Sequence, residues 1–218
     1  MLLFSYGESN GKGLNMSFIY FYPNRPILVP PDPVNPMEPS SGFLDQHEAE
    51  GKWVAEQKWN GDNTLVYLEE GRAPVLWNRH HAKLSYMPPP EVLEELSRWP
   101  QGSILNCETV NSKTKTVKDL LIVHCVMAWK GELLAGKTWG DSRALLDQAI
   151  VDGLSGEHVQ VSKLWRTGFW DLYQAADGAI IEGIILKNPA GRLVYSTTPI
   201  KDVAWMKKFR KPSRKYAF

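Results

Sequence analysis

The sequence predicts an α+β protein built mainly from antiparallel sheets. Strand-like apolar runs outnumber helical ones, and pairs of runs that resemble hairpins alternate with single helices. The chain also lacks a glycine-rich phosphate-binding motif between a strand and a helix, which would favour a doubly wound parallel sheet. These features together predict antiparallel pairing, with the helices at the periphery.

The composition is ordinary for a globular protein of one large domain or two small ones. Hydrophobic residues make up 43% of the 218 residues, charged residues make up 22%, and the net charge is +1. No apolar run approaches the ~20 residues of a membrane span, and "MLLF" is too short for a signal peptide. Cys107 and Cys125 both lie in apolar runs, so we expect reduced core thiols in a cytoplasmic, monomeric protein.

The chain divides into a short extension, a domain and a tail. Residues 1–15 are expected to form a disordered extension, residues 16–211 the domain, and residues 212–218 a basic tail. Within the domain, residues 23–41 contain seven prolines, which predicts an extended arm without regular structure.

The first half of the domain is expected to hold five strands and one helix. "EEGRAP" is typical of a hairpin turn between the second and third strands. "PPEVLEELSRW", residues 89–99, predicts a short helix with Pro90 in its first turn. The strands are expected at residues 52–59, 63–70, 74–79, 103–110 and 120–129.

The second half of the domain adds two helices and four strands. Thr138 can cap a helix over residues 138–154, because Asp141 stands three residues later in the capping-box position. A second helix is predicted over residues 168–176. The strands are expected at residues 158–165, 179–188, 192–197 and 203–211.

Several charged residues interrupt these apolar strands, which is costly unless the charges are paired or used. Taken alone, each can be a strand-end charge that points into water. Lys58 lies at the end of a strand beside a chain reversal, among bulky neighbours. Glu182 and Lys187 would point to opposite faces of a regular strand, so a bulge or the strand end must re-aim one if they share a site. In chain order the set is Lys58, Arg79, Glu108, Glu182 and Lys187.

The segments around these charges resemble, in order, the motifs of the covalent nucleotidyltransferases, the superfamily of ATP-dependent DNA ligases, RNA ligases and mRNA capping enzymes. "KWNG" resembles motif I, K-x-D/N-G, and "EGIILK" matches motif IV in full. Five further segments are similar to the remaining motifs: "WNRHHAK", "ILNCETV", "VHCVMAWKG", "GDSRALL" and "WMKKFR". The resemblance implies a minimal ligase that consists of the nucleotidyltransferase domain, with antiparallel sheets flanking a nucleotide cleft.

The resemblance implies a covalent mechanism with ATP. Lys58 would attack the α-phosphorus of ATP and form a lysine–AMP intermediate, after its amine has lost a proton. Lys187 and Lys208 would favour that proton loss and neutralise the α-phosphate. Glu182, together with Glu108, would hold Mg²⁺ or Mn²⁺ beside the phosphates.

The resemblance also implies a set of nucleotide-binding residues. Glu108 would accept a hydrogen bond from the ribose, Arg79 would hold ribose or phosphate, and His124 would stack on adenine. The whole set is Glu56, Gly61, Asn63, Arg79, Glu108, His124, Arg143, Glu182, Lys187, Lys208 and Arg210.

Some positions depart from the family pattern. "NCE" replaces the "DGE" of ligases, and His124 stands where phenylalanine is usual. "WMKKFR" allows two registers, of which Lys208 with Arg210 is preferred over Lys207 with Phe209. The chain ends about seven residues after this segment, so we expect no OB domain and no C-terminal domain, as in a minimal or a truncated ligase.

The last twelve residues are strongly basic and contain no acid. Such a tail is either simply solvated or in contact with phosphates. The residues expected to bind nucleic acid are Lys207, Lys211, Arg214 and Lys215.

We therefore expect an ATP-dependent ligase that joins a 5′-phosphate to a 3′-hydroxyl in a nicked or splinted duplex. Asn63 stands where one group of RNA ligases has asparagine, which favours RNA, although the L-x-x-E and W-x-K-K forms favour DNA. Two alternatives remain open: a capping guanylyltransferase with the same lysine chemistry, and a non-catalytic nucleic-acid-binding module of the same fold. By analogy, a ligase this small would suit a phage.

Overall fold

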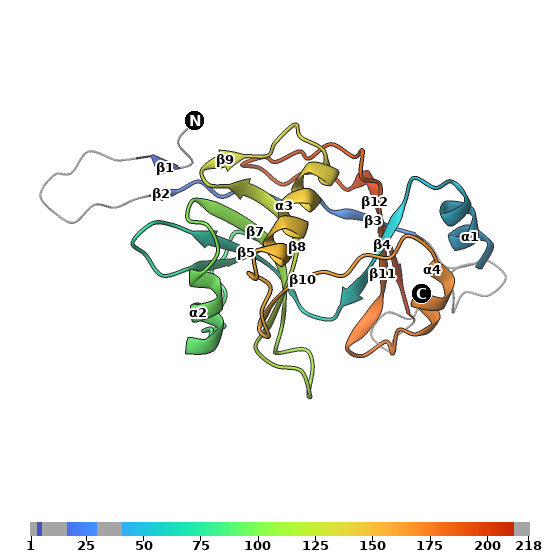
Figure 1. The fold of residues 1–218 in the computed structure, drawn as a ribbon, viewed down its shortest axis with the longest axis horizontal. Helices are drawn as coiled ribbons and strands as arrows, with labels where there is room; N and C mark the ends of the chain where they lie inside the picture. Colours follow the sequence, from blue (N-terminus) through green and yellow to red (C-terminus); the bar gives the residue numbers. More distant parts are fainter. Residues whose placement is uncertain (1–3, 6–16, 30–40, 212–218) are drawn as a thin grey trace, which may run out of the picture.

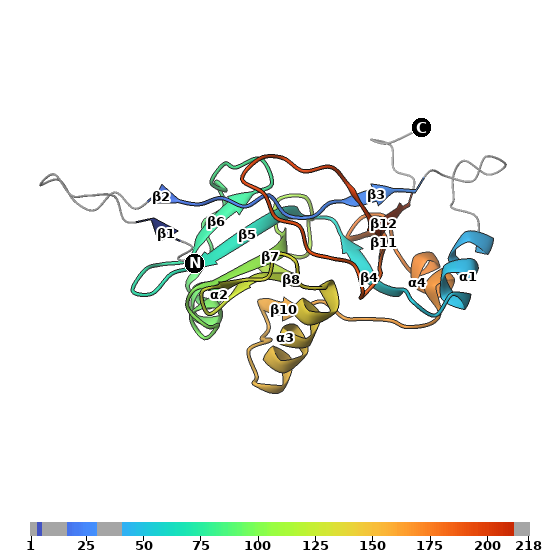
Figure 2. The same cartoon turned by 90° about the horizontal axis from the view of Figure 1, so that it is seen from above.

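Two β-sheets lie next to each other, and helices pack on them (Figure 1, Figure 2). A narrow hollow between the sheets, called the cleft below, is lined by Asn106 and His124 of one sheet and by Lys187 and Met206 of the other. The computed structural model describes residues 4–5, 17–29 and 41–211. A separate antiparallel pair of two-residue strands, β1 (Phe4–Ser5) and β2 (Ser17–Phe18), lies near the N-terminus.

The larger sheet has six strands and is antiparallel except at one edge. Its main path runs β10-β8-β7-β5-β6, and β9 also pairs with β8. The edge strand β10 pairs with β8 in parallel. The strands are β5 (Asp62–Leu68), β6 (Val75–Asn78), β7 (Ser103–Val110), β8 (Leu120–Trp129), β9 (Glu132–Leu133) and β10 (Val159–Val161).

The smaller sheet has four strands in the order β3-β12-β11-β4. Its pairs are antiparallel except the edge pair of β3 and β12. The strands are β3 (Pro26–Leu28), β4 (Val54–Trp59), β11 (Ile181–Lys187) and β12 (Val203–Arg210).

Each sheet buries one face under a pair of helices. On the smaller sheet, Ala55, Ile184 and Phe209 pack against α1 (Ser41–Ala49) and α4 (Phe169–Gln174). On the larger sheet, alternate apolar residues of β5, β7 and β8 form a core with α2 (Pro90–Ser97) and α3 (Trp139–Val151). Because strand side chains alternate between faces, the residues between these apolar positions lie on the opposite face. Part of that face is also buried, where Leu65, Tyr67 and Ile104 pack against Tyr20 and Phe21.

The fold class predicted from the sequence is confirmed, and most elements lie where they were expected. β7 and β8 occupy the predicted ranges, because each is an apolar run bounded by turn residues. Thr138 and Asp141 form the predicted capping box at the start of α3. Cys107 and Cys125 are buried and free, as predicted for reduced core thiols.

Three local predictions were wrong. Residues 192–197 form no regular strand, because Arg192 and Ser196 make only isolated bridges, to loop residues of other segments. The predicted arm contains β3, in which Pro26 can stand because an edge strand tolerates a missing N–H. The sequence did not predict α1, which begins soon after the last proline of the arm. Residues 30–40 of the arm lie outside the described residues.

Two predictions about the chain ends fall mostly or wholly on residues that the structure does not describe. In the expected extension, residues 1–15, only Phe4–Ser5 is described. The basic tail, residues 212–218, is outside the described residues. In the part of the chain that is described, no helix is long and apolar enough to cross a membrane.

Candidate active site

Strand register brings Lys58 to the cleft. Lys58 on β4 lies opposite Gly183 on β11, and Gly183 lies opposite Arg210 on β12. Paired residues of adjacent strands share a face, so Lys58 and Arg210 point to the same side of the smaller sheet. Ile185 pairs in the same way with Glu56 and with Lys208. One face of this sheet therefore carries Glu56, Lys58, Lys187, Lys208 and Arg210.

A β-bulge adds Glu182 to this face. The register between β11 and β4 shifts between Ile181 and Gly183, so Glu182 is the extra residue. Its carboxylate pairs with the ammonium of Lys58 and accepts a hydrogen bond of 3.0 Å from Nη2 of Arg210. The bulge therefore brings Glu182 to the same face of β11 as Lys187, which a regular strand would not do.

The charges around Glu182 control its protonation. Burial alone would raise the pKa of the Glu182 carboxyl, but the cations of Lys58 and Arg210 outweigh burial and lower it. Glu182 is therefore a carboxylate at neutral pH.

Gly183 fixes the bulge, because no other residue fits there. Its φ is +147°, and a Cβ at this position would lie 2.0 Å from the carbonyl oxygen of Phe209 on β12. A side chain would therefore push β11 away from β12 and displace Glu182.

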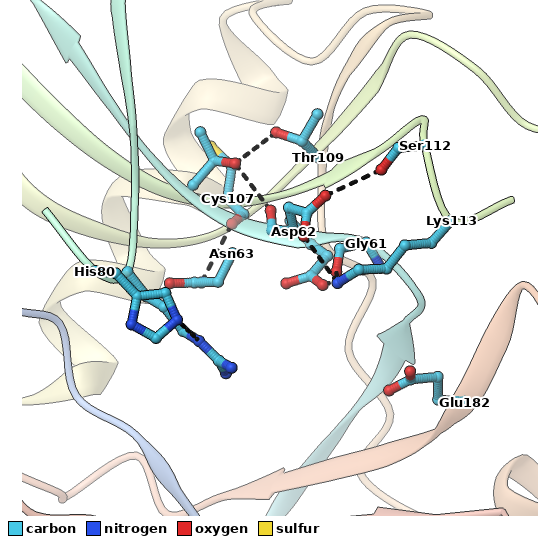
Figure 3. Close-up of polar contacts among 12 residues, drawn as sticks. Gly61, Asp62, Asn63, His80, Cys107, Thr109, Ser112, Lys113 and Glu182 are labelled. Atoms are coloured by element: carbon cyan, nitrogen blue, oxygen red, sulfur yellow. Dashed lines mark hydrogen bonds and ion pairs between the residues drawn. The ribbon is translucent and has the colours of Figure 1, made fainter. Parts of the chain in front are cut away.

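The chain reversal after Lys58 brings the larger sheet into the site. A Cβ at Gly61 would lie 2.4 Å from the carbonyl oxygen of Thr109, so the turn packs directly on β7. The Gly61 N–H donates to Oε1 of Glu108 over 3.0 Å. Burial raises the pKa of Glu108 to about 7, although the cations of Lys58 and Lys113 oppose this. Figure 3 shows Gly61 beside Asp62, with Glu182 on the facing strand of the smaller sheet.

A polar cluster from three strands of the larger sheet lies deeper in the cleft. Nδ2 of Asn63 donates to Oδ1 of Asn106 over 2.8 Å and lies 3.4 Å from Nε2 of His124. Burial, together with the cation of Lys187, keeps the pKa of His124 well below its ordinary value. His124 is therefore a neutral, half-buried ring at neutral pH.

Lys187 is held at the junction of the two sheets. Its Nζ lies 2.7 Å from Oε2 of Glu56, donates to the carbonyl oxygen of His124 over 3.1 Å and sits 4.8 Å from the ring centre of Trp139. The Ser162 hydroxyl donates to the other oxygen of Glu56 over 3.0 Å. Both charged side chains are 2% exposed, so the cation of Lys187 is committed to Glu56 in this structure.

Arg143 and Arg79 make their hydrogen bonds to residues other than Lys58 and Glu182. Arg143 on α3 donates to the carbonyl oxygen of Ser162 over 2.6 Å and pairs with Asp147, so it braces Glu56 through Ser162. Arg79 is exposed just after β6, where its Nε donates to His80 over 3.1 Å.

The two neighbouring lysines of β12 point in opposite directions. Lys208 lies on the cleft face, where burial lowers the pKa of its amine and the cations of Arg210 and Lys58 contribute to the lowering. Lys207 lies on the other face, with its Nζ 2.6 Å from Nε2 of His47 on α1 and 4.9 Å from the ring centre of Trp53. Lys207 therefore lies on the face of the smaller sheet opposite to Lys58, and its contact with nucleic acid stays a prediction.

Of the remaining basic residues expected to bind nucleic acid, one is described. Lys211 follows β12, and its N–H donates to the carbonyl oxygen of Glu182 over 2.7 Å. Arg214 and Lys215 lie outside the described residues.

Solved structures of ligases share this architecture, whereas neither a protein family nor a curated protein matches the sequence. The ligase domain of LigD from M. tuberculosis aligns with a TM-score of 0.55 and 20% identity, over 72% of this chain and 53% of that one. A mycobacterial DNA ligase D complexed with ATP aligns with a TM-score of 0.55 and 18% identity, over 84% of this chain and 59% of that one. This chain therefore shares the fold of these ligase structures.

A smaller ligase shares the same fold. A Lig E DNA ligase, described as binding DNA with a minimal scaffold, aligns with a TM-score of 0.50 and 10% identity. That alignment covers 73% of this chain and 62% of the other. The chain thus spans between 53% and 62% of the length of these three ligase structures.

Most of the residues predicted for catalysis and nucleotide binding form two groups, and two arginines lie outside them. Lys58 and Arg210 both contact Glu182, while Glu108 lies near them on the larger sheet. Asn63 and His124 lie deeper, next to the buried pair of Glu56 and Lys187. Arg143 lies behind this pair, and Arg79 is apart at the surface.

Sequence reasoning missed two polar residues of the site. Asn106 lies in the apolar interior of β7, but alternation places it on the same face as Glu108, which could have identified it. Lys113, in the loop between β7 and β8, pairs with Asp62 over 2.8 Å. The basic run "NSKTK" directly after the strand of Glu108 was the available signal.

If a divalent cation binds at this site, Glu108 and Glu182 are the carboxylates that could hold it together with substrate phosphates. Among the described residues, no group of three or more His, Cys, Asp or Glu side chains could hold a metal ion. Glu108 and Glu182 are close enough for each to influence the charge of the other, and Mg²⁺ is often held by one or two carboxylates together with substrate phosphates.

Proposed function

We propose that the protein is an ATP-dependent polynucleotide ligase whose nucleophile is Lys58. The observation that carries the proposal is the contact of Lys58 with a bulged Glu182 at the mouth of a cleft between two sheets. A strand-end lysine in water would need no such partner, whereas a lysine that must be aimed at a phosphorus atom does. The likeness to ligase nucleotidyltransferase domains supports the same chemistry.

In the first step, the Nζ of Lys58 attacks the α-phosphorus of ATP. The bond from this phosphorus to the bridging oxygen breaks, pyrophosphate leaves, and Lys58 gives up a proton as the phosphoramidate forms. Lys208 and Arg210 share the face of Lys58 and can neutralise the phosphate oxygens. Glu182 can hold the attacking amine in position through its contact with Nζ.

Adenine would occupy the inner part of the cleft. Because His124 is neutral and half-buried, its ring can stack on a base without bringing a second charge next to Lys187. Glu108, at the level of Gly61, is placed to accept a hydrogen bond from the ribose.

Mg²⁺ held by Glu182 and Glu108 would stabilise the negative charge that develops on the phosphates. Ionisation of Glu108 is part of this role, and its pKa of about 7 means that the carboxylate is only partly formed at neutral pH. Binding of a divalent cation would favour the ionised form.

Two transfers complete the joining reaction. An oxygen of a 5′-phosphate attacks the phosphorus of lysine–AMP, so Lys58 leaves and regains a proton. A 3′-hydroxyl then attacks the activated 5′-phosphorus, and AMP leaves as the phosphodiester forms. We propose a nicked or splinted duplex as substrate, because pairing to a second strand already holds the two ends together.

We propose RNA before DNA as the preferred strand. Asn63, the residue that favours RNA ligases by resemblance, lies in the polar cluster of the cleft, where it contacts Asn106 and His124. The DNA ligases with the same fold are at most 20% identical, so they bear on the fold and not on the sugar.

The test is covalent labelling. The protein is incubated with Mg²⁺ and α-labelled ATP or GTP, denatured and separated by electrophoresis. We expect label from ATP on the parent protein and none on Lys58→Ala, while Lys52→Ala, which removes a lysine from an exposed ion pair near α1, keeps its label. Label on Lys58→Ala would overturn the assignment. Label only from GTP would indicate a guanylyltransferase, and no label from either nucleotide would indicate a binding module.

A further inference from the structure

The loop between β7 and β8 is basic and borders the cleft. Residues 111–119 contain Lys113, Lys115 and Lys118 and a single acid, Asp119. The carboxylate of Asp119 accepts a hydrogen bond of 2.9 Å from the hydroxyl of Tyr86. Figure 1 shows the loop projecting beyond the body of the larger sheet.

Lys113 reaches from this loop to the segment that directly follows the nucleophile. Its Nζ donates to the carbonyl oxygen of Gly61 and lies 2.8 Å from Oδ1 of Asp62. The hydroxyl of Ser112 donates to the other oxygen of Asp62 over 3.1 Å. Figure 3 shows Lys113 extended toward Gly61 and Asp62, with Glu182 across from them.

The loop has internal contacts that hold its shape. Nζ of Lys118 donates to the carbonyl oxygens of Thr114, over 2.8 Å, and of Asn111. The hydroxyl of Thr114 donates to the carbonyl oxygen of Val117. A loop with these bonds presents Lys113 from a defined position, which limits the entropy lost when a ligand binds.

Lys113 is the most accessible of the cations that surround the nucleophile. Its side chain is 47% exposed, compared with 14% for Lys58 and 25% for Arg210. An exposed ion pair such as Lys113–Asp62 contributes little to stability, so a phosphate can replace the Asp62 carboxylate.

We propose that Lys113 binds a phosphate of the polynucleotide substrate at the strand end that receives AMP. This inference rests on the proposed ligase function, because it assigns Lys113 to the second step rather than to the reaction with ATP. Lys208 and Arg210 lie on the face of the smaller sheet that carries Lys58, where the proposed reaction would place the α-phosphate, whereas Lys113 reaches the turn at Gly61 from a loop of the larger sheet. A polynucleotide that enters along the β7–β8 loop would meet Lys113 before it reached Lys58.

The test separates the two steps. Protein is labelled with α-labelled ATP, freed of nucleotide, and mixed with a nicked duplex that carries a 5′-phosphate; AMP transfer is followed with time. We expect Lys113→Gln to self-adenylate within about twofold of the parent but to transfer AMP at least tenfold more slowly. Lys113→Arg should restore most of the transfer. The matched control, Lys52→Gln, removes an exposed lysine that is also ion-paired and should change neither step.

Two further measurements exclude a purely structural role. The dependence of log affinity on log salt should become shallower by about one for Lys113→Gln, as expected for one lost phosphate contact. Asp62→Asn breaks the same ion pair but leaves the cation, so it should transfer AMP at least as fast as the parent. Equal loss of transfer in Asp62→Asn and Lys113→Gln, or unchanged transfer in Lys113→Gln, would overturn the proposal. A parent protein that takes up no AMP would instead overturn the ligase function itself.

Discussion

At the scale of single residues, the buried pair of Glu56 and Lys187 joins the two sheets. Among the ion pairs of the described residues it is the least exposed, and Lys187 also donates to the carbonyl oxygen of His124 on the larger sheet. Removing one partner of such a pair leaves an uncompensated charge away from water. Lys187 therefore has a role in stability that is separate from any contact with ATP.

We predict that Lys187→Ala lowers the free energy of unfolding by about 3 kcal/mol and abolishes self-adenylation. The double variant Glu56→Gln, Lys187→Met removes both charges and should regain most of the lost stability, but no adenylation. Urea unfolding and labelling with ATP measure the two effects. Arg98→Ala, which removes an exposed pair with Glu94, is the control and should change stability by less than about 0.5 kcal/mol. Parental labelling of the double variant would show that Lys187 serves stability alone.

At the scale of elements, the β-bulge in β11 places the carboxylate of Glu182 beside Lys58 on β4. A regular β11 would send the carboxylate of Glu182 to the face covered by α1 and α4, among the apolar residues of that core. The bulge directs it to Lys58 instead, and the close approach of Gly183 to β12 keeps the bulge in place.

We predict that Gly183→Ala lowers the free energy of unfolding by at least about 2 kcal/mol, because the new methyl group meets backbone and not a movable side chain. Gly51→Ala is the matched control, since Gly51 also has a positive φ, of +65°, but has open space around its Cα. It should cost about 1 kcal/mol. Thermal unfolding compares the two, and equal losses would mean that the contact with Phe209 does not restrain the bulge.

Elements with local signals could be predicted from the sequence, and elements that depend on distant partners could not. Alternation and turn residues located β7 and β8, and capping residues located the start of α3. The edge strand β3 has no such signal, because its pairing with β12 joins residues far apart in the chain. For the site, sequence motifs identified Lys58 and Glu182 as candidates, and strand alternation indicated that Glu182 and Lys187 could share a face only through a bulge or the strand end. The register of β11 in the structure shows that the irregularity is a bulge. Lys113 lies on a loop without periodicity, so its contact with Asp62 could not be foreseen.

At the scale of the whole molecule, the proposed contact with a polynucleotide would draw on cations near Lys58 and Glu182. Lys113 and Lys115 lie on the β7–β8 loop, and Lys211 follows β12 beside Glu182. Lys207 lies on the opposite face of the smaller sheet, where its Nζ contacts His47 on α1. This arrangement offers a short contact with one side of a duplex, over roughly three or four phosphates.

We predict that sealing of nicked duplexes weakens steeply with salt, with a slope of log affinity against log salt of roughly −3. A matched set of nicks with ribose or deoxyribose on each side, assayed at low and moderate salt, measures sugar preference and salt dependence together. We expect faster sealing where the nicked strand is RNA. Sealing of all-DNA nicks alone would contradict the preference for RNA, and sealing that ignores salt would contradict the electrostatic contact.

The order in which the chain is synthesised has a consequence for the nucleophile. Lys58 and Glu182 are separated by 124 positions, and β4 obtains its strand partner only from β11. On the ribosome, β5, β6, β7 and β8 can therefore pair with one another well before β4 has a neighbour. The lysine that we propose as the nucleophile is thus synthesised early but meets Glu182 late. A nascent chain that stalls before β11 carries no assembled site, and adenylation, if it occurs as proposed, would report that the protein has finished folding.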